Sequence, residues 1–272
     1  MDTTTTREKV LITVMTYPHP SESYQELVCT AGITESLEWV RLYPVDYRYR
    51  ARNQQFKKYQ WIEVELAAPK SNDNRKESRR PILDSIRLLG ERLPTKDNWA
   101  ERRALIDRMP HHSMKELKEL FGKERVSLGV VRPSRVLDLE IRKADPEWKP
   151  EWQNIYDQLR LFEPPPKPLR KLPYSFHYVF ESEGSSKPHT AMCEDWELGT
   201  LFLKESDRLG SEEAAAESVK NKFLGELCRA DKDTRFFMGT RFPYNVWLVL
   251  GVFWPPKAEK PSKTTEKQPT LF

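Results

Sequence analysis

The sequence has few cysteines, no long apolar run and little excess of either charge, and each lack narrows the classes of protein that it can encode. Its three cysteines, Cys29, Cys193 and Cys228, lie far apart and are odd in number. This usage favours buried free thiols in a reducing compartment over a disulfide framework. The longest apolar stretch, residues 246–254, is too short to cross a bilayer. We therefore expect a cytoplasmic protein with no membrane contact.

Motifs of nucleotide chemistry are also missing. The chain contains no GxxxxGK loop and no GxGxxG turn. None of His19, His111, His112 and His177 stands at a recognisable catalytic spacing from a serine, cysteine or aspartate. These absences argue against nucleotide hydrolysis and Rossmann chemistry, and no cofactor is expected.

The charge balance is close to even, with 45 Lys and Arg against 41 Asp and Glu and a formal net charge of +4. Because the overall field is weak, a nucleic-acid site must come from local clusters of cations.

Such a cluster lies between two runs that resemble strands, Leu37–Val45 and Gln60–Ala67. Cations next to aromatic rings suit a polyanion with bases that can stack. The alternative is a solvated loop whose rings fold back onto the protein. A segment over residues 69–81, which we expect to be a charged loop, adds further cations, and we expect both groups to face one groove. The candidate nucleic-acid-binding residues are Tyr47, Arg48, Tyr49, Arg50, Arg52, Lys57, Lys58, Arg75, Lys76, Arg79 and Arg80.

The pattern of elements predicts an α+β protein in two parts. Short strands over residues 9–16, 24–32, 37–45, 60–67 and 82–91 predict a small antiparallel β-barrel of OB, SH3 or PUA-like type. Two helices follow, at 99–109 with Asn98 as its cap and at 114–123 with a capping box of Ser113 and Glu116. Strands at 126–131 and 135–141 are expected to close the barrel or to extend its sheet.

The second part begins after a proline-rich segment, residues 163–173, which we interpret as a semi-rigid linker between domains. The expected division is a barrel domain with a helical insert (1–162), the linker, an α+β domain (174–256) and a disordered tail (257–272). In the α+β domain we expect helices at 196–206 and 212–229 between strand pairs.

Several short motifs carry a resemblance to a widespread family of uncharacterised prokaryotic proteins. They are WVRLYPV (39–45), KKYQWIEV (57–64), the Glu-Asp-Trp-Glu helix start (194–197), FF-x-GT (236–240) and LGVF-x-PPK (250–257). The resemblance covers residues 9–257. It implies that these parts form one family unit, and it implies no mechanism.

Two groups of residues suggest an enzymatic alternative, a metal-dependent nuclease or nucleotide-processing enzyme. The densest set of metal-capable side chains comprises His189, Cys193, Glu194, Asp195 and Glu197, but no second Cys or His pair lies near them. Their carboxylates would equally favour a helix N-terminus, with Cys193 packed inward. Asp138 and Glu140 share one strand face, yet Arg142 stands where metal-dependent nucleases have a lysine. We therefore predict no metal site.

The last five residues resemble the bacterial sliding-clamp-binding motif, Gln-Leu-(Ser/Asp)-Leu-Phe. Gln268, Leu271 and Phe272 match it, and Pro269 departs from the usual leucine. The sequence thus favours a nucleic-acid-binding accessory protein of DNA metabolism or genome defence that binds DNA or RNA without catalysis. A protein-interaction module that binds no nucleic acid is a further alternative.

Overall fold

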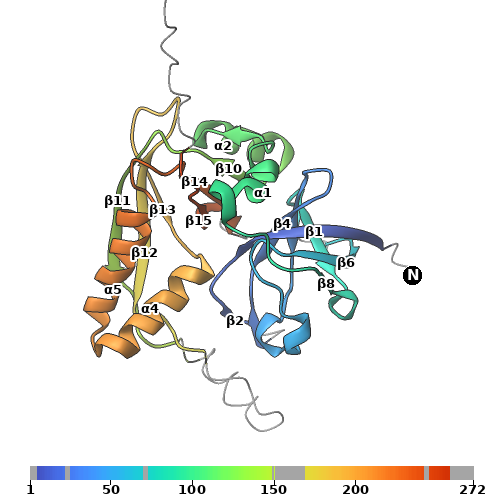
Figure 1. The fold of residues 1–272 in the computed structure, drawn as a ribbon, viewed down its shortest axis with the longest axis horizontal. Coiled ribbons are helices and arrows are strands. Elements are labelled where there is room, and N and C mark those ends of the chain that lie inside the picture. Colours follow the sequence, from blue (N-terminus) through green and yellow to red (C-terminus); the bar gives the residue numbers. More distant parts are fainter. Residues whose placement is uncertain are drawn as a thin grey trace, which may run out of the picture.

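A closed ring of five strands forms the N-terminal part of the computed structural model, which describes residues 5–21, 25–69, 73–148, 150, 169–241 and 245–257 (Figure 1). The predicted α+β class with an N-terminal barrel is therefore confirmed. β6 pairs with β1 and closes the ring, while β8 (Arg87–Leu89) pairs with β6 outside it. The strands of the ring, in order, are β1 (Thr6–Met15), β4 (Thr30–Thr34), β5 (Trp39–Leu42), β7 (Ser78–Pro81) and β6 (Trp61–Ala67).

The period-two pattern of β6 points its apolar side chains into the barrel, since Ile62 and Val64 are fully buried and Leu66 is nearly so. The fifth strand of the ring is β7, which lies in the segment that we expected to be a loop. β7 runs parallel to β5, so the ring is not wholly antiparallel. Residues 82–91 supply only a 3₁₀ turn (Leu83–Ser85) and β8. A small hairpin of β2 (His19–Ser21) and β3 (Gln25–Leu27) precedes β4.

Two helices follow the barrel, α1 (Lys96–Ile106) and α2 (Met114–Glu124). The capping box of α2 is confirmed, because the Ser113 hydroxyl accepts from the Glu116 amide and the Glu116 carboxylate accepts from the Ser113 amide. Asn98 does not cap a helix that starts at Trp99, and that expectation is wrong. Asp97, Asn98 and Trp99 instead form a left-handed stretch with φ of 49°, 55° and 65°.

Two further sheets make up the rest of the described protein. One has the order β15 (Val246–Phe253), β14 (Arg235–Arg241), β10 (Leu128–Val131) and β9 (His111–His112). The other has the order β11 (Arg135–Lys143), β12 (Tyr174–Glu181) and β13 (His189–Met192). The expectation that the strands near 128–143 close the barrel or extend its sheet is wrong. β10 is buried along its whole length and pairs with β14, and β11 pairs with β12.

These pairings join residues on both sides of the proline-rich segment. The predicted helix over 151–161 and most of the linker lie outside the described residues, and the division at 163–173 stays a prediction. α4 (Trp196–Leu209) and α5 (Glu212–Lys220) lie along the β11–β13 sheet, and a π-helical turn (Asn221–Glu226) continues α5 (Figure 1). The described residues contain no helix that is both long and apolar enough to cross a membrane.

The barrel and the C-terminal region, which holds the two further sheets, meet at β14 and β15. These two strands lie between the barrel and the β11–β13 sheet (Figure 1). Leu11 and Ile33 of the barrel share one apolar core with Phe237, Leu250 and Phe253. A buried ion pair spans the same junction, because Lys58 Nζ lies 2.9 Å from Oδ2 of Asp195, the N-cap of α4. The junction thus places barrel strands directly against the C-terminal strands.

Candidate anion-binding pocket

The basic connection between β5 and β6 is not the free cationic surface that we expected. Arg48 pairs with the buried carboxylate of Glu26 at 2.8 Å, and the Arg50 side chain is only 5% exposed against Asp46 and Asp84. Lys58 is buried with Asp195 and Glu197. Although burial alone lowers it, the two carboxylates hold the pKa of Lys58 above its usual value. These three cations stabilise the fold, and their assignment as nucleic-acid ligands is corrected.

The rings of this connection pack inward as well. The Tyr47 hydroxyl donates to the Phe56 carbonyl at 2.6 Å, and the Tyr47 ring lies 5.4 Å from that of Trp196. The Tyr49 hydroxyl is buried. Base stacking on these rings is therefore not supported, and the alternative of rings folded onto the body holds. Arg52 and Lys57 remain exposed at the surface.

The second predicted cluster divides between two places. Lys76 lies on the surface and pairs with Glu124 at 2.8 Å. Arg75, Arg79 and Arg80 instead line a pocket of about 390 Å³ between the barrel and the C-terminal strands. Arg79 and Arg80 reach the pocket because β7 lies beside β5 in the ring, and Arg75 lies just before β7.

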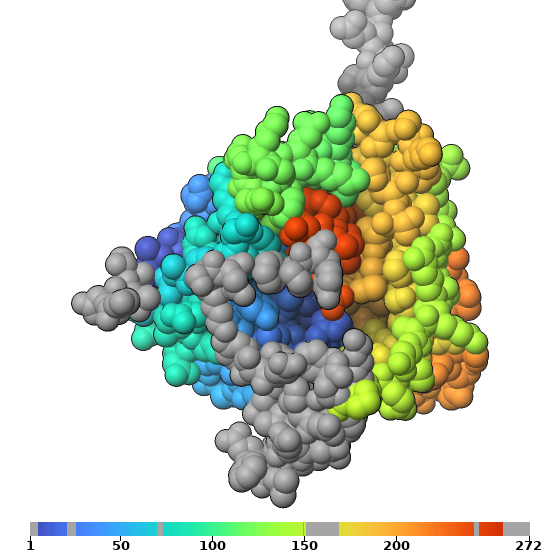
Figure 2. All heavy atoms as spheres, turned by 180° about the vertical axis from the view of Figure 1, so that it is seen from behind, coloured from blue at the N-terminus to red at the C-terminus, as the bar shows by residue number. Residues whose placement is uncertain are grey.

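This cavity, which we call the arginine pocket, is lined by residues from both parts of the protein. The barrel contributes Arg41 from β5 and the arginines of the β7 segment, and Arg241 comes from the end of β14. Leu27, Tyr43 and Leu248 supply apolar walls. In Figure 2 the N-terminal segments (blue) and the C-terminal strands (red) come to the surface close together.

The charge of the lining is unbalanced. Five arginines face two carboxylates, Asp73 and Glu194, and each carboxylate already has an arginine partner. Arg75 makes two bonds of 2.8 Å to Asp73, and Arg241 lies 3.2 Å from Glu194. Burial lowers the pKa of His19, also in the lining, so its imidazole is neutral at pH 7. The pocket therefore carries positive charge at neutral pH.

Arg41 is the residue of this lining that most needs an anion. It is 3% exposed, and its Nη2 donates to the backbone and side-chain oxygens of Ser127 at 3.2 and 3.3 Å. No carboxylate of the described residues lies within 4 Å of its guanidinium. Burial, reinforced by the neighbouring Arg75, lowers the pKa of Arg41 to about 10, so it remains a cation at pH 7. The charges of Glu77 and Asp73 act on Arg41, but neither carboxylate forms a direct ion pair with it, and a buried charge without such a pair is costly.

Several polar atoms of the lining also lack partners. Within the described part of the chain, Nε of Arg41, Nε of Arg80 and Oγ1 of Thr240 are buried without a hydrogen bond. Buried polar groups in proteins are nearly always paired, and a ligand, a water or an ion is one explanation for an exception. The pocket thus combines surplus positive charge with unused donors.

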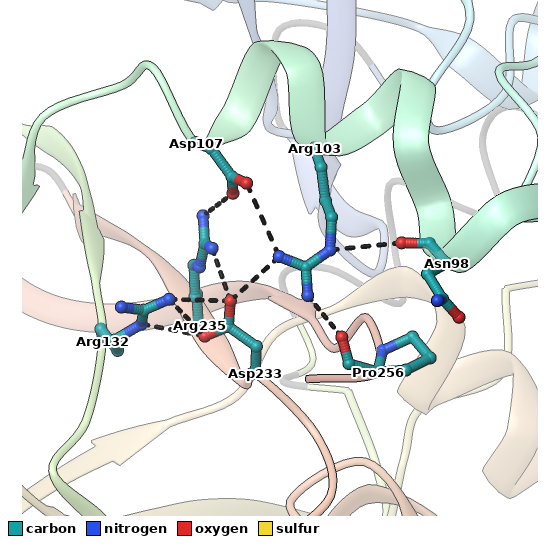
Figure 3. Close-up of polar contacts among 7 residues, drawn as sticks. All are labelled: Asn98, Arg103, Asp107, Arg132, Asp233, Arg235 and Pro256. Carbon is teal, nitrogen blue, oxygen red and sulfur yellow. Dashed lines mark hydrogen bonds and ion pairs between the residues drawn. The ribbon is translucent and has the colours of Figure 1, made fainter. Parts of the chain in front are cut away.

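A second group of arginines shows the contrast, because its cations are all matched (Figure 3). Arg103, Arg132 and Arg235 converge on the carboxylate of Asp233, with Arg235 Nη2 2.6 Å from Oδ2. Arg235 also pairs with Asp107 at 2.6 Å. This cluster joins α1 to β14 and is structural. Arg103 and Arg132 lie 130 and 101 residues from Asp233, so the sequence offered no signal for the cluster.

The residues of the enzymatic alternative are not brought together. Asp138 pairs with Lys220 at 2.8 Å, Glu140 pairs with Arg142, and His189 contacts the Ser185 hydroxyl at 2.8 Å. Glu194 lies at the arginine pocket, whereas Asp195 is buried with Lys58. Across the residues that the structure describes, no three His, Cys, Asp or Glu side chains are grouped to hold a metal ion. The described residues that suggested this alternative therefore do not form one site.

Comparison with known proteins places the chain in a family. It belongs to the family described as "Domain of unknown function (DUF8757)", whose model matches residues 110–271, and a second model, "Domain of unknown function (DUF8758)", matches residues 6–108. No protein with a curated description matches. Among solved structures, the chain is similar to a murine DNA binding protein bound with double-stranded DNA, at 9% identity and a TM-score of 0.30, covering 94% of this chain and 97% of that one. A likeness at this level supports no inference about function.

Proposed function

We propose that the protein binds nucleic acid and that the arginine pocket receives part of the sugar-phosphate backbone. The observation that carries the proposal is Arg41, a buried cation without a carboxylate ion-pair partner among the described residues, in a pocket lined by five arginines and two carboxylates. An anion in the pocket would supply the direct ion-pair partner that Arg41 lacks among the described residues.

The chemistry of the lining favours a phosphate ester over a simple inorganic anion. Guanidinium groups match the oxygens of a phosphate in bidentate geometry. The cavity of about 390 Å³ falls in the range of pockets that hold an organic ligand, and its Tyr43 and Leu248 walls are apolar. Arg79 is exposed and Arg241 is half exposed, so both can meet a polyanion at the surface.

The test is binding of labelled 20-nucleotide DNA and RNA, single- and double-stranded, by fluorescence anisotropy at several salt concentrations. We expect the double variant Arg79→Gln/Arg80→Gln to weaken binding at least tenfold and to lower the salt slope by about one to two units. The matched control is Arg87→Gln on β8, an exposed arginine outside the pocket. Absence of binding at low salt, or equal binding by the pocket variant and the control, would refute the proposal.

We further propose that the C-terminal motif tethers the protein to a bacterial sliding clamp, which would place it in DNA replication or repair. Gln268, Leu271 and Phe272 lie outside the described residues, so this proposal rests on the sequence alone. A peptide of residues 266–272 should bind a clamp with a Kd of about 1 µM. Equal binding by a Leu271→Ala/Phe272→Ala peptide would remove the tether and leave the pocket proposal untouched.

A further inference from the structure

The arginine pocket does not end at Arg241, because a second hollow begins there. This hollow shares Arg241 and Leu248 with the pocket, and its other lining residues include Arg142, His177, Met192 and Val246. Its lining comes from β11, β12, β13 and the start of β15, so it lies on the side of the pocket that faces away from the barrel strands. The two hollows therefore adjoin at Arg241 and Leu248, and we refer to them together as the path.

We propose that this path holds two successive nucleotides of an unpaired strand, one inside the arginine pocket and its neighbour across Arg241 in the second hollow. The inference rests on the proposed function and narrows its ligand to single-stranded nucleic acid or to a duplex nucleotide turned out of the base stack.

The depth of the pocket excludes a regular duplex as the full ligand. Arg41 is 3% exposed and Arg75 is 9% exposed, so a ligand must enter the cavity to approach them. The phosphates of an intact duplex follow the outside of a wide cylinder, and its bases are stacked inside. Only a nucleotide that leaves the stack can reach such a recess, as in enzymes that turn a base out of the helix.

The second hollow offers contacts to a neighbouring nucleotide, which a strand has and a free mononucleotide lacks. Arg241 is 49% exposed and Arg142 is 50% exposed, and each pairs with a single carboxylate, so both lie where a continuing backbone would pass. Burial, together with Arg142, lowers the pKa of His177, and its neutral ring offers a flat face beside these cations. Cations alternating with apolar and flat surfaces are typical of sites for single strands.

A length series tests the strand directly. The affinity of the full chain for oligothymidylates of one, two, four and twelve nucleotides, measured at one salt concentration, should rise at least tenfold from one to two nucleotides and change much less beyond two. The variant Arg142→Gln should reduce binding of the four-nucleotide ligand severalfold and leave binding of the mononucleotide unchanged. Mononucleotide binding as tight as that of the tetranucleotide would overturn the inference.

A duplex with 2-aminopurine at one position tests entry into the pocket, because the fluorescence of this base rises when it unstacks. We expect the signal to rise at least twofold with wild-type protein when the base sits opposite an abasic site, and to rise less with Arg79→Gln/Arg80→Gln. Binding of this duplex and of a fully paired one with equal affinity and no rise in fluorescence would overturn the inference while leaving nucleic-acid binding intact. Loss of binding to every nucleic acid would instead overturn the proposed function itself.

Discussion

The buried pair of Lys58 and Asp195 should contribute more to stability than any other ion pair at the junction of the two parts. Both side chains are almost fully buried, at 5% and 1% exposed. Asp195 accepts from Lys58 Nζ at 2.9 and 3.1 Å, from the Glu197 amide at 2.9 Å and from the Val252 amide at 3.2 Å. One carboxylate therefore connects the barrel, α4 and β15.

The distance and burial of the Lys58–Asp195 pair set the expected loss of unfolding free energy. At 2.9 Å and an effective dielectric constant of about 20, Coulomb's law gives about 6 kcal/mol of attraction. Burial of the two charges offsets much of it, but removal of one partner leaves the burial cost of the other. Lys58→Met should thus lower the free energy of unfolding by about 3–5 kcal/mol. Asp195→Asn should cost about 2–3 kcal/mol, because Lys58 keeps Glu197 at 3.0 Å.

Urea unfolding of the wild type, both single variants and the double variant Lys58→Met/Asp195→Asn forms a double-mutant cycle. The double variant should be more stable than the sum of the single losses predicts, by about 2 kcal/mol, because it leaves neither charge of the buried pair unpaired, and Glu197 is half exposed to solvent. Single losses below 1 kcal/mol, or losses that add within about 0.5 kcal/mol, would refute the reasoning.

Three further predictions concern the fold around the pocket. Arg50→Ala should lose about 2 kcal/mol because its side chain is 5% exposed and bonded to Asp46 and the Leu83 carbonyl, whereas exposed Arg52→Ala should stay within about 0.5 kcal/mol in the same urea assay. In thermal unfolding, Gly199→Ala should cost about 1–3 kcal/mol because its Cβ would lie 2.3 Å from the Tyr17 ring, while Gly122→Ala in α2 meets no atom within 4 Å and should be neutral or stabilising; similar effects of the two would contradict the packing. Although burial raises it, Arg235 and Arg132 hold the pKa of Asp233 below its usual value, so its contribution is present above about pH 4 and is lost as the pH falls through the folded-state pKa. Urea unfolding between pH 6 and pH 3 should therefore show a steeper loss of stability for the wild type than for Asp233→Asn, and parallel curves would exclude this contribution.

Local patterns in the sequence determined much of the secondary structure. Period-two alternation located β6, and the Ser113–Glu116 spacing located the start of α2, because both signals depend only on neighbours along the chain. The α+β class and the N-terminal barrel followed from the order of such elements. Strand β7 escaped detection, since a run of charged residues gives no apolar alternation even when a sheet neighbour supplies its backbone partners.

Tertiary structure alone decided which cations are available. Arginines and lysines next to one another in the sequence look alike, but their carboxylate partners are remote: Glu26 for Arg48, Asp84 for Arg50, and Asp195, 137 residues away, for Lys58. Arg41 lies in a strand whose apolar neighbours gave no hint of a binding role, and only the approach of β7 and β14 places other arginines around it. A sequence records which charges a chain carries, whereas the net charge of a pocket depends on which of them folding neutralises.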